Sequence, residues 1–512
     1  MKRGLSILLT LMMAVSVIAG CAGKQNGGGQ ANENGQNTGP AGPVKKTFTM
    51  LTESHPSWPY NKDWLIWDLI EEKTGVTFDV QLPSGKLEDT INLIVASGNM
   101  PDLMFMLSRQ QANKYGKQGA LVNILDYKDL MPNFVKWMAK YPEEAKAAVA
   151  ADGKMYMFPN QGFGETNRMI WLYREDIFKK HNLTVPKTYD ELYTVLKKLK
   201  EIYPDSYPFT FRFGPNLAIL INLSPNFATN PGFYYDENTK EVRYGPIEDN
   251  YKTMISWLNK FYKEGLMPPD WLTIETKQWQ DMISTNKSFV TVDYIGRIDF
   301  FNQSLRKDNP EFNIAFMPPP AGQPGGKQLN AYTHYLESGL TISSTSKNIK
   351  DIMKFMDFYY TEEGRDIASW GKEGVTYTVE NGKKKMKSDF IDVADLRKKT
   401  GLATNGTYTW IDYDAHLSLA SPELQAAYVE ARKYDDVYRP NPSFNEQEFE
   451  IMSTVGQAID KHRNETIAKF ILGERSLTEW DKYVDEVKKL GLQQVLDIHK
   501  TAFERAEKVD LK

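Results

Sequence analysis

The chain has 512 residues, with 62 lysines and arginines against 66 aspartates and glutamates, and a formal net charge of -4. This balance lacks the excess of basic residues that nucleic-acid binding requires, so we expect no nucleic-acid partner. A single cysteine, Cys21, excludes an internal disulfide, a cysteine metal cluster and a catalytic thiol elsewhere in the chain. The length is enough for two or three domains, and two large lobes fit best.

The first twenty residues have the layout of a signal peptide. Lys2 and Arg3 precede an apolar run over residues 5–18, which is followed by two small residues. The run is shorter than the roughly 20 apolar residues that a membrane-spanning helix needs. We therefore expect residues 1–20 to be a cleaved leader and not an anchor.

The end of this leader resembles a known processing site. Ile18-Ala19-Gly20-Cys21 resembles the lipobox of bacterial lipoproteins, in which the cysteine receives diacylglycerol and the leader is cut just before it. Acyl chains such as palmitate on Cys21 would hold the protein stably, since each buried methylene contributes about 0.8 kcal/mol. We expect a protein anchored by lipid on the extracytoplasmic face of the cell membrane; the alternative is a secreted protein with a chance cysteine.

A segment of low complexity follows the cysteine. Residues 22–44 are rich in glycine, asparagine and glutamine and have almost no large apolar side chains. Such a segment cannot bury enough surface to fold. We assign residues 21–45 to a flexible tether and expect the folded body to begin at residue 46.

The body opens with alternating strand-like and helical segments. They are expected, in the order strand, helix, strand, helix, strand, over residues 47–51, 63–73, 76–80, 87–97 and 102–106. This alternation favours a largely parallel sheet covered by helices. Ligands of such folds gather at the carboxyl ends of the strands, so the loops over residues 52–60 and 107–111 are expected to reach a ligand.

A second alternating unit begins with a predicted strand over residues 169–173. Residues 188–191 have the spacing of a capping box, which predicts a helix that continues to residue 202. Further single strands are expected at 209–213, 288–292, 313–316 and 339–342. A hairpin of two strands is expected over residues 233–244. The chain ends in helices, one of which is expected to start at a second capping box, residues 476–479, and to stop at Gly491.

Motifs of catalysis and cofactor binding are missing. The sequence has no G-x-S-x-G, no H-E-x-x-H and no Walker A loop, and no pair of its 6 histidines has metal-ligand spacing. Carboxylate pairs for glycoside hydrolysis need no motif, so the 66 acidic residues leave that chemistry open. We expect no enzyme, no cofactor and no metal site, and keep a surface-anchored polysaccharide-acting enzyme as an alternative.

Several short segments resemble one family in an unbroken order. Residues 96–103, Ala-Ser-Gly-Asn-Met-Pro-Asp-Leu, resemble the A-[ST]-G-x-x-P-D-[LI] segment of extracellular solute-binding proteins (family 1) of ABC importers. Residues 152–159 are similar to the family's D-G-K-x-Y-x-x-P, and residues 171–176 to the start of its second lobe. Residues 370–377 and 469–474 resemble a loop and the closing helices of its lipid-anchored, oligosaccharide-binding branch.

The resemblance implies an α/β, bilobal periplasmic-binding-protein-like fold, with two mixed sheets flanked by helices and joined by a hinge. It implies an N-terminal lobe of residues 46–160 and 335–378, and a C-terminal lobe of residues 161–334 and 379–512. The implied function is a monomeric receptor that closes on a small-molecule solute, an oligosaccharide, and delivers it to an ABC permease. A sensor or adhesion protein on the same fold remains an alternative.

Candidate ligand contacts follow from the same resemblance and from the strand-end loops. They are Glu53, Ser54, His55, Trp58, Ser108, Arg109, Asn167, Arg168, Tyr294, Arg297, Trp370 and Tyr377. Tyr294 aligns with a loop that supplies a stacking aromatic ring in the family. The alternatives are a solvated loop for residues 53–58, a surface salt bridge for Asn167 and Arg168, and core packing for Trp370 and Tyr377. Residues 180–191 lack the ligand spacing of the calcium loop that some relatives carry there.

Overall fold

The computed structural model describes residues 45–162, 168–212, 214, 217–322, 327–332, 337–437 and 442–511. They belong to one compact unit, Lys45–Lys512. The predicted leader, Cys21 and Asn167 lie outside the described residues. Within the described part of the chain, no helix has the length and apolar character needed to cross a membrane.

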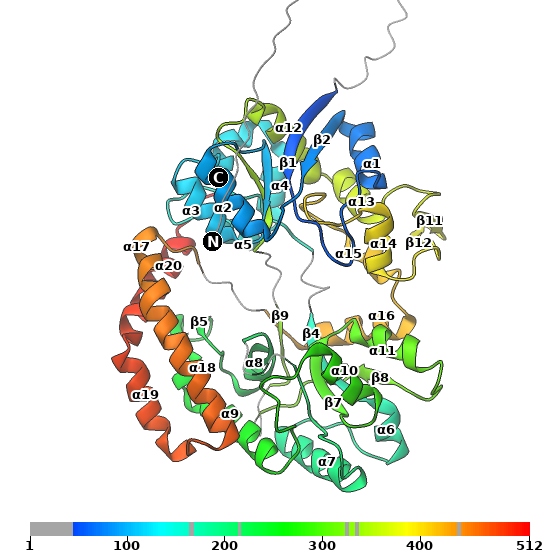
Figure 1. Ribbon diagram of the computed structural model, residues 1–512, viewed down its shortest axis with the longest axis vertical. Helices are drawn as coiled ribbons and strands as arrows, with labels where there is room; N and C mark the ends of the chain where they lie inside the picture. Colours follow the sequence, from blue (N-terminus) through cyan, green and yellow to red (C-terminus); the bar gives the residue numbers. More distant parts are fainter. Residues whose placement is uncertain are drawn as a thin grey trace, which may run out of the picture. The chain divides into compact units, whose positions relative to one another are not determined.

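The first sheet has four strands in the order β10-β3-β1-β2, of which β1 and β2 are labelled in Figure 1. These strands are β1 (Lys46–Leu51), β2 (Val76–Gln81), β3 (Leu103–Met106) and β10 (Gly339–Ile342). β1 is parallel to β2 and β3, and β10 is antiparallel to β3. Helices α1 (Leu65–Thr74) and α2 (Leu87–Ser97) connect the parallel strands. The predicted strand and helix alternation is confirmed here.

Local chemistry explains why these elements begin and end where they do. α1 and α2 both end at a glycine with positive φ, 70° at Gly75 and 74° at Gly98, and each glycine donates its N–H back into the helix. Asp102 precedes β3 and accepts hydrogen bonds from the N–H and the hydroxyl of Thr49, at 3.0 and 3.1 Å. Because Thr49 lies in β1, this carboxylate ties the two central strands together.

The first core is a cluster of buried side chains that packs around this sheet. It draws on residues 48–158 and 340–415. The remaining elements of this part are α3 (Arg109–Lys117), η1 (Ile124–Leu130), α4 (Pro132–Lys140), α5 (Pro142–Ala147), α12 (Ile349–Tyr359), α13 (Glu362–Trp370), β11 (Tyr377–Glu380), β12 (Lys383–Met386), α14 (Val393–Thr400) and α15 (Tyr413–Leu417).

The second sheet has the order β7-β4-β8, and both outer strands are antiparallel to β4. Its strands are β4 (Met169–Arg174), β7 (Val290–Tyr294) and β8 (Ile314–Phe316). The strand predicted over residues 209–213 is reduced to a single parallel bridge between Phe209 and Val290, so this prediction was wrong. Pro208 has no N–H to donate and Gly214 turns with a φ of 53°, which leaves too short a run for a ladder.

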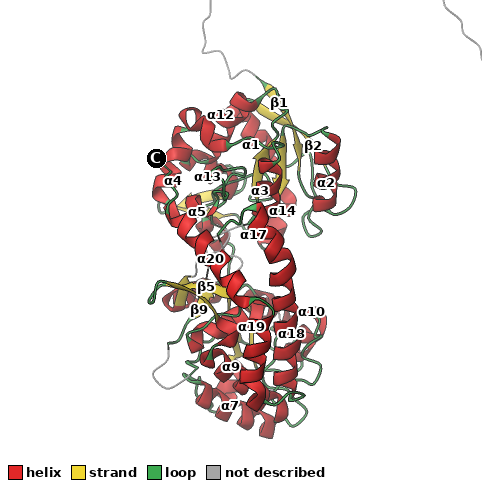
Figure 2. Ribbon diagram, turned by 90° about the vertical axis from the view of Figure 1, so that its left-hand side faces the viewer, coloured by secondary structure: helices red, strands yellow, loops and turns green. Residues whose placement is uncertain are grey.

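The second core packs around this sheet and draws mainly on residues 169–317, 424–431 and 459–495. In Figure 2 the part of the chain around this second core consists mostly of helices, drawn in red. The remaining elements are α6 (Glu175–Lys180), α7 (Tyr189–Ile202), α8 (Leu217–Leu223), η2 (Ser224–Phe227), β5 (Phe233–Asp236), β6 (Glu241–Tyr244), η3 (Gly245–Ile247), α9 (Asp249–Lys263), α10 (Thr276–Ser284), α11 (Arg297–Leu305), β9 (Asn330–Tyr332), α16 (Pro422–Ala431), η4 (Arg432–Tyr434), β13 (Asp435–Val437), α17 (Glu446–Ile451), η5 (Met452–Gly456), α18 (Gln457–Leu472), η6 (Leu477–Glu479), α19 (Trp480–Lys489) and α20 (Leu492–Glu507).

The first predicted capping box is largely confirmed. The Thr188 hydroxyl accepts a hydrogen bond from the N–H of Glu191 at 3.2 Å, and α7 begins there. The Glu191 carboxylate accepts from the N–H of Lys187 at 2.7 Å, one residue earlier than the motif requires. A local contact therefore starts this helix, as the sequence predicts.

The second predicted box, at residues 476–479, is formed only in part. Ser476 accepts from the N–H of Thr478 at 3.3 Å and starts a short 3-10 turn. Ion pairs of Glu479 with Arg475 at 3.5 Å and Lys482 at 3.6 Å explain why its carboxylate does not cap the turn. α19 ends at Lys489, and Gly491 marks the start of α20.

The two large cores and the two largest sheets give the α/β bilobal fold that the sequence predicts, and the pairs β11-β12, β13-β9 and β5-β6 form three further two-stranded sheets. The predicted limits of the lobes stay a prediction. Side chains between Met386 and Ala415 lie in the first core, although the prediction places residues 379–512 in the C-terminal lobe. The last residues also pack there, through Val509 and Leu511.

Candidate functional site

The loop that follows β1 holds four of the predicted contacts and is shaped by its own side chains. Ser54 accepts a hydrogen bond from the N–H of Tyr60, and His55 Nδ1 accepts one from the N–H of Ser57, each at 3.1 Å. The rings of His55 and Trp58 stack with centroids 3.6 Å apart and planes 9° from parallel. The loop is therefore an ordered platform, and His55 covers one face of the Trp58 ring.

Residues distant in sequence support this platform. The guanidinium of Arg397, in α14, lies 4.8 Å from the centre of the Trp58 ring. Glu53 accepts a hydrogen bond from the Asn405 side chain, and the Thr52 hydroxyl donates to the Asn405 carbonyl at 3.0 Å. Arg397 and Asn405 had no signal in the sequence, because they lie in a segment more than 300 positions further along the chain.

The pKa values of Arg397 and His55 are shifted mainly by burial. Burial lowers the pKa of Arg397 to about 10, so the guanidinium stays charged at neutral pH. Burial also lowers the pKa of His55, with Glu53 opposing the shift and Arg397 adding to it. A neutral imidazole packs on Trp58 without the cost of desolvating a charge.

Ser108 and Arg109 begin α3, at the carboxyl end of β3. Ser108 caps the helix by accepting a hydrogen bond from the N–H of Gln111 at 3.3 Å. Arg109 donates to Glu337 at 3.1 Å and to the carbonyl of Ala147. Its side chain is 9% exposed. Both residues thus have structural contacts, and their predicted ligand role stays a prediction.

Arg168 lies directly before β4, in the segment that arrives from the first core. Both of its terminal nitrogens bind the carboxylate of Asp435, one of them at 3.0 Å. Its guanidinium also stacks on Tyr332 at 4.1 Å. The alternative weighed for Arg168 was a salt bridge at the surface, but the pair is buried, with the arginine side chain 1% exposed, and it joins β4 to β13 and β9.

Tyr294 and Arg297 lie where β7 ends, next to the first residue of β4. Tyr294 pairs with Met169, and the N–H of Ile295 donates to the carbonyl of Arg168 at 2.9 Å. Tyr294 is half-buried, and Arg297 opens α11. The structure thus brings three predicted contacts, Arg168, Tyr294 and Arg297, to one edge of the second sheet.

Trp370 and Tyr377 belong to the first core. They lie neither in the loop that holds Trp58 nor with Arg168, Tyr294 and Arg297. Trp370 is 3% exposed and donates its indole N–H to Asp412 at 3.0 Å. The ring of Tyr377 meets it edge-on, with centroids 5.7 Å apart. Core packing was the alternative weighed for both residues. It describes Trp370, which has almost no face open to a ligand in this conformation.

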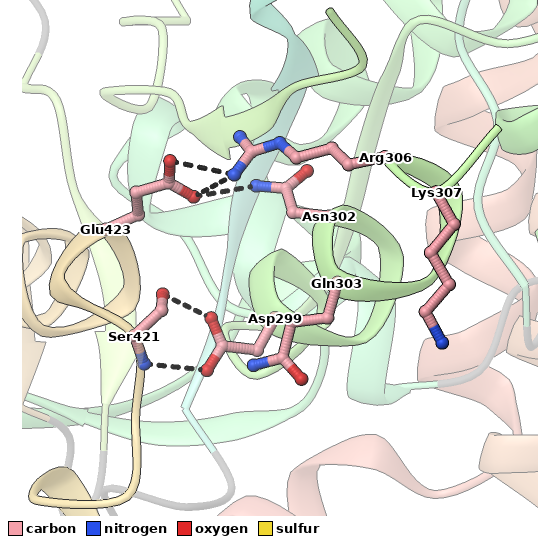
Figure 3. A pocket seen from close by; sticks show the side chains of 7 residues that line it. All are labelled: Asp299, Asn302, Gln303, Arg306, Lys307, Ser421 and Glu423. Carbon is pink, nitrogen blue, oxygen red and sulfur yellow. Dashed lines mark hydrogen bonds and ion pairs between the residues drawn. The ribbon is translucent and has the colours of Figure 1, made fainter. Parts of the chain in front are cut away.

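Neither of the two best-formed hollows among the described residues is lined by Tyr294. A cavity of about 290 Å³ borders α11 and the start of α16, and several of its polar side chains bind one another, as Glu423 does with Arg306 at 2.9 Å (Figure 3). A cavity of about 10 Å³ borders Arg109, close to the smallest volume that holds a water molecule. Among the described residues, no group of three His, Cys, Asp or Glu side chains has the arrangement to hold a metal.

A family model for the bacterial extracellular solute-binding protein matches residues 62–366. The match covers more than half of the chain and includes every strand of the second sheet and all strands of the first except β1. The chain belongs to the bacterial extracellular solute-binding protein family. It is therefore a solute-binding protein and not an enzyme, as the sequence predicts.

Two curated relatives match this solute-binding protein over nearly its full length. It is 24% identical over 541 residues to the fructooligosaccharide ABC transporter substrate-binding protein FusA of Streptococcus pneumoniae, with 98% of this chain and 97% of FusA covered. It is 24% identical over 517 residues to the polygalacturonan/rhamnogalacturonan-binding protein YtcQ of Bacillus subtilis, with 98% and 99% covered. These relatives support the predicted family on the scale of the whole protein.

A solved structure supports the fold. The alginate-binding protein AlgQ2, without calcium ion, superposes with a TM-score of 0.72 at 25% identity, over 91% of this chain and 99% of that chain. The bilobal α/β prediction is confirmed by this likeness together with the two sheets and cores.

Proposed function

We propose that this solute-binding protein is a lipid-anchored extracytoplasmic receptor that binds an oligosaccharide and delivers it to an ABC permease by closure of its lobes. The observation that carries the proposal is the presence of an aromatic side chain beside polar groups at the strand ends of both sheets. These are Trp58 with His55 on the first sheet and Tyr294 with Arg297 on the second. Aromatic rings with polar neighbours suit sugars, which offer an apolar ring face and hydroxyl groups.

The relatives favour a sugar over other solutes. FusA is named for fructooligosaccharides and YtcQ for polygalacturonan and rhamnogalacturonan. Both are matched over nearly their whole length, so the same overall architecture serves carbohydrate ligands in them. We extend this ligand class, and the ABC permease as partner, to the present chain, acting as a monomer.

Closure of the lobes follows from thermodynamics once the ligand touches both. A ligand shifts a conformational equilibrium by the difference between its affinities for the two states. A sugar that contacts Trp58 in one lobe and Tyr294 in the other favours the closed state, because only closure brings both rings to it. The remaining predicted contacts, Glu53, Ser54 and Ser108, would add hydrogen bonds to sugar hydroxyls.

A glycan screen tests the binding. Thermal unfolding of the mature chain is measured with panels of neutral oligosaccharides, acidic oligosaccharides and peptides. Ligand at one hundred times its dissociation constant stabilises the folded state by about 2.7 kcal/mol. We expect stabilisation by at least one glycan; stabilisation by peptides with no response to any glycan contradicts the proposal.

The anchor has a separate test. Metabolic labelling with palmitate and cell fractionation are compared for the natural chain and for Cys21→Ala. We expect the natural chain to carry label and stay with the membrane, because acylation of Cys21 supplies the anchor. Cys21→Ala is expected to lose the label. An unlabelled natural chain overturns the anchor and leaves sugar binding untouched.

A further inference from the structure

Two arginines share one buried carboxylate next to Tyr294. Arg212 donates to Asp293 through Nε at 2.6 Å and through Nη2 at 3.0 Å. Arg297 donates to the same carboxylate through Nε at 2.9 Å. The Asp293 side chain is 0% exposed. One buried carboxylate is thus shared by two arginines.

Arg297 has donors left over. Its Nε is used by Asp293, whereas Nη1 and Nη2 have no hydrogen-bond partner among the described residues. The side chain is 19% exposed, so it reaches the surface. The rings of Trp279 and Phe300 lie 5.4 and 5.2 Å from its guanidinium, and together with Asp293 they hold the group in a defined place. The two donors are thus oriented before any ligand arrives.

The acidic groups nearest along α11 are already occupied. Asp299, two positions after Arg297, accepts hydrogen bonds from the hydroxyl and the N–H of Ser421, the latter at 2.9 Å (Figure 3). Glu423 is bound by Arg306 through both oxygens at 2.9 Å. These carboxylates pair elsewhere, and neither of them binds the Nη1 and Nη2 donors of Arg297.

The chemistry of this arrangement selects one class of sugar. The planar fork of an arginine matches the two oxygens of a carboxylate, and such charge-assisted pairs are stronger than neutral hydrogen bonds. Building on the proposed function, we propose that Arg297 binds the carboxylate of a uronic acid unit while the neighbouring Tyr294 packs on its sugar ring. The oligosaccharide is then an acidic one. A neutral sugar offers Nη1 and Nη2 of Arg297 no negative charge where closure of the lobes removes water.

The experiment compares ligands that differ only in charge. Trimers of galacturonate, mannuronate and guluronate are each paired with the trimer in which every carboxyl is reduced to a hydroxymethyl group. Binding to the mature protein is measured by calorimetry. We expect at least one acidic trimer to bind at least tenfold more tightly than its reduced partner, and the affinity for it to fall as salt is raised.

Three variants localise the effect. Arg297→Gln is expected to abolish the preference for the acidic trimer, and Arg297→Lys to retain part of it, since lysine keeps the charge without the fork. Lys307→Gln removes the same charge from the other end of α11, at an exposed residue, and is expected to keep the full preference. Circular dichroism checks that each variant folds. An equal loss in Lys307→Gln and Arg297→Gln overturns the assignment to Arg297.

The outcomes separate this inference from the proposed function. Equal binding of an acidic trimer and its reduced partner overturns the uronate inference and leaves the oligosaccharide receptor standing. Binding of neutral glycans with no acidic trimer bound does the same. Failure of every glycan to bind overturns the proposed function and the inference with it.

Discussion

Arg168 and Asp435 form an ion pair between residues 267 positions apart in the sequence. The arginine side chain is 1% exposed and the aspartate 16%. Arg168 precedes β4, the first strand of the second core, and Asp435 opens β13. The pair therefore joins two segments at the edge of the second sheet that carries Tyr294.

We expect Asp435→Asn to lower the free energy of unfolding by about 3 kcal/mol, because it removes a charged hydrogen-bond partner from a buried guanidinium. Urea denaturation followed by tryptophan fluorescence measures the change. Glu430→Gln is the matched control, since Glu430 pairs with Lys433 at 2.6 Å on an exposed surface. We expect that control to stay within about 0.5 kcal/mol. Equal effects of the two substitutions would show that burial of the Arg168 pair adds nothing.

The proposed function places the ring of Tyr294 against the ligand. On the proposed function, Tyr294→Ala is expected to weaken binding of the cognate oligosaccharide about tenfold, because the stacking surface is lost. Tyr294→Phe keeps that surface and is expected to stay within about threefold, the loss of one hydroxyl contact. Calorimetric titration distinguishes them. A phenylalanine variant as weak as the alanine variant argues for a hydroxyl contact instead of stacking.

Two glycines that end helices make a matched pair. Gly401 ends α14 with a φ of 72°, and a Cβ there would lie 2.6 Å from the Trp64 ring. That ring is fixed by its N–H, which donates to the carbonyl of Lys398 at 2.9 Å. Gly98 ends α2 with a φ of 74°, but a Cβ there meets nothing within 4 Å.

Gly401→Ala is expected to cost about 2–4 kcal/mol, from left-handed backbone strain plus the clash. Gly98→Ala is expected to cost about 1 kcal/mol, from backbone strain alone. Denaturation midpoints measure both values. Similar costs for the two substitutions would mean that Trp64 moves aside without loss.

His499 makes stability depend on pH. The side chain is 1% exposed, it stacks on Phe233 at 4.3 Å, and its ring nitrogens have no hydrogen-bond partner among the described residues. Burial lowers the pKa of His499 to about 4. In the unfolded chain the group takes up its proton near pH 6.5, so between pH 6.5 and 4 the unfolded state binds more protons than the folded state.

Stability therefore falls as the pH drops through this window, by up to about 1.4 kcal/mol per pH unit from this group. His499→Phe keeps the stacking and removes the titration, so we expect a shallower loss of stability between pH 6.5 and 4. Part of the slope is expected to remain, since burial lowers the pKa of His416 to about 3. Thermal melting across the window measures it, and an unchanged slope in the variant contradicts the assignment.

Much of the first sheet follows from local pattern. The strand predicted over residues 47–51 is found as Lys46–Leu51, and the predicted helix over 87–97 is found at Leu87–Ser97. Their signals are contained within a few residues: the alternation of apolar side chains, the helical spacing and a glycine that ends the helix. The strand predicted over residues 209–213 shows the limit of local pattern. Only a single bridge forms there, at Phe209, because the length of a strand depends on the partner beside it.

In the candidate site, too, some features follow from the sequence and others only from the tertiary structure. The sequence alone determined the family, the two-lobed α/β fold, the strand-end loops and the candidates Trp58, Tyr294 and Arg297, because these depend on short ordered motifs and local periodicity. The tertiary structure alone decided that Arg397 supports Trp58, and that Arg212 shares Asp293 with Arg297. Those contacts join segments far apart in the chain, and the charges and free donors at a site exist only once folding has brought the partners together.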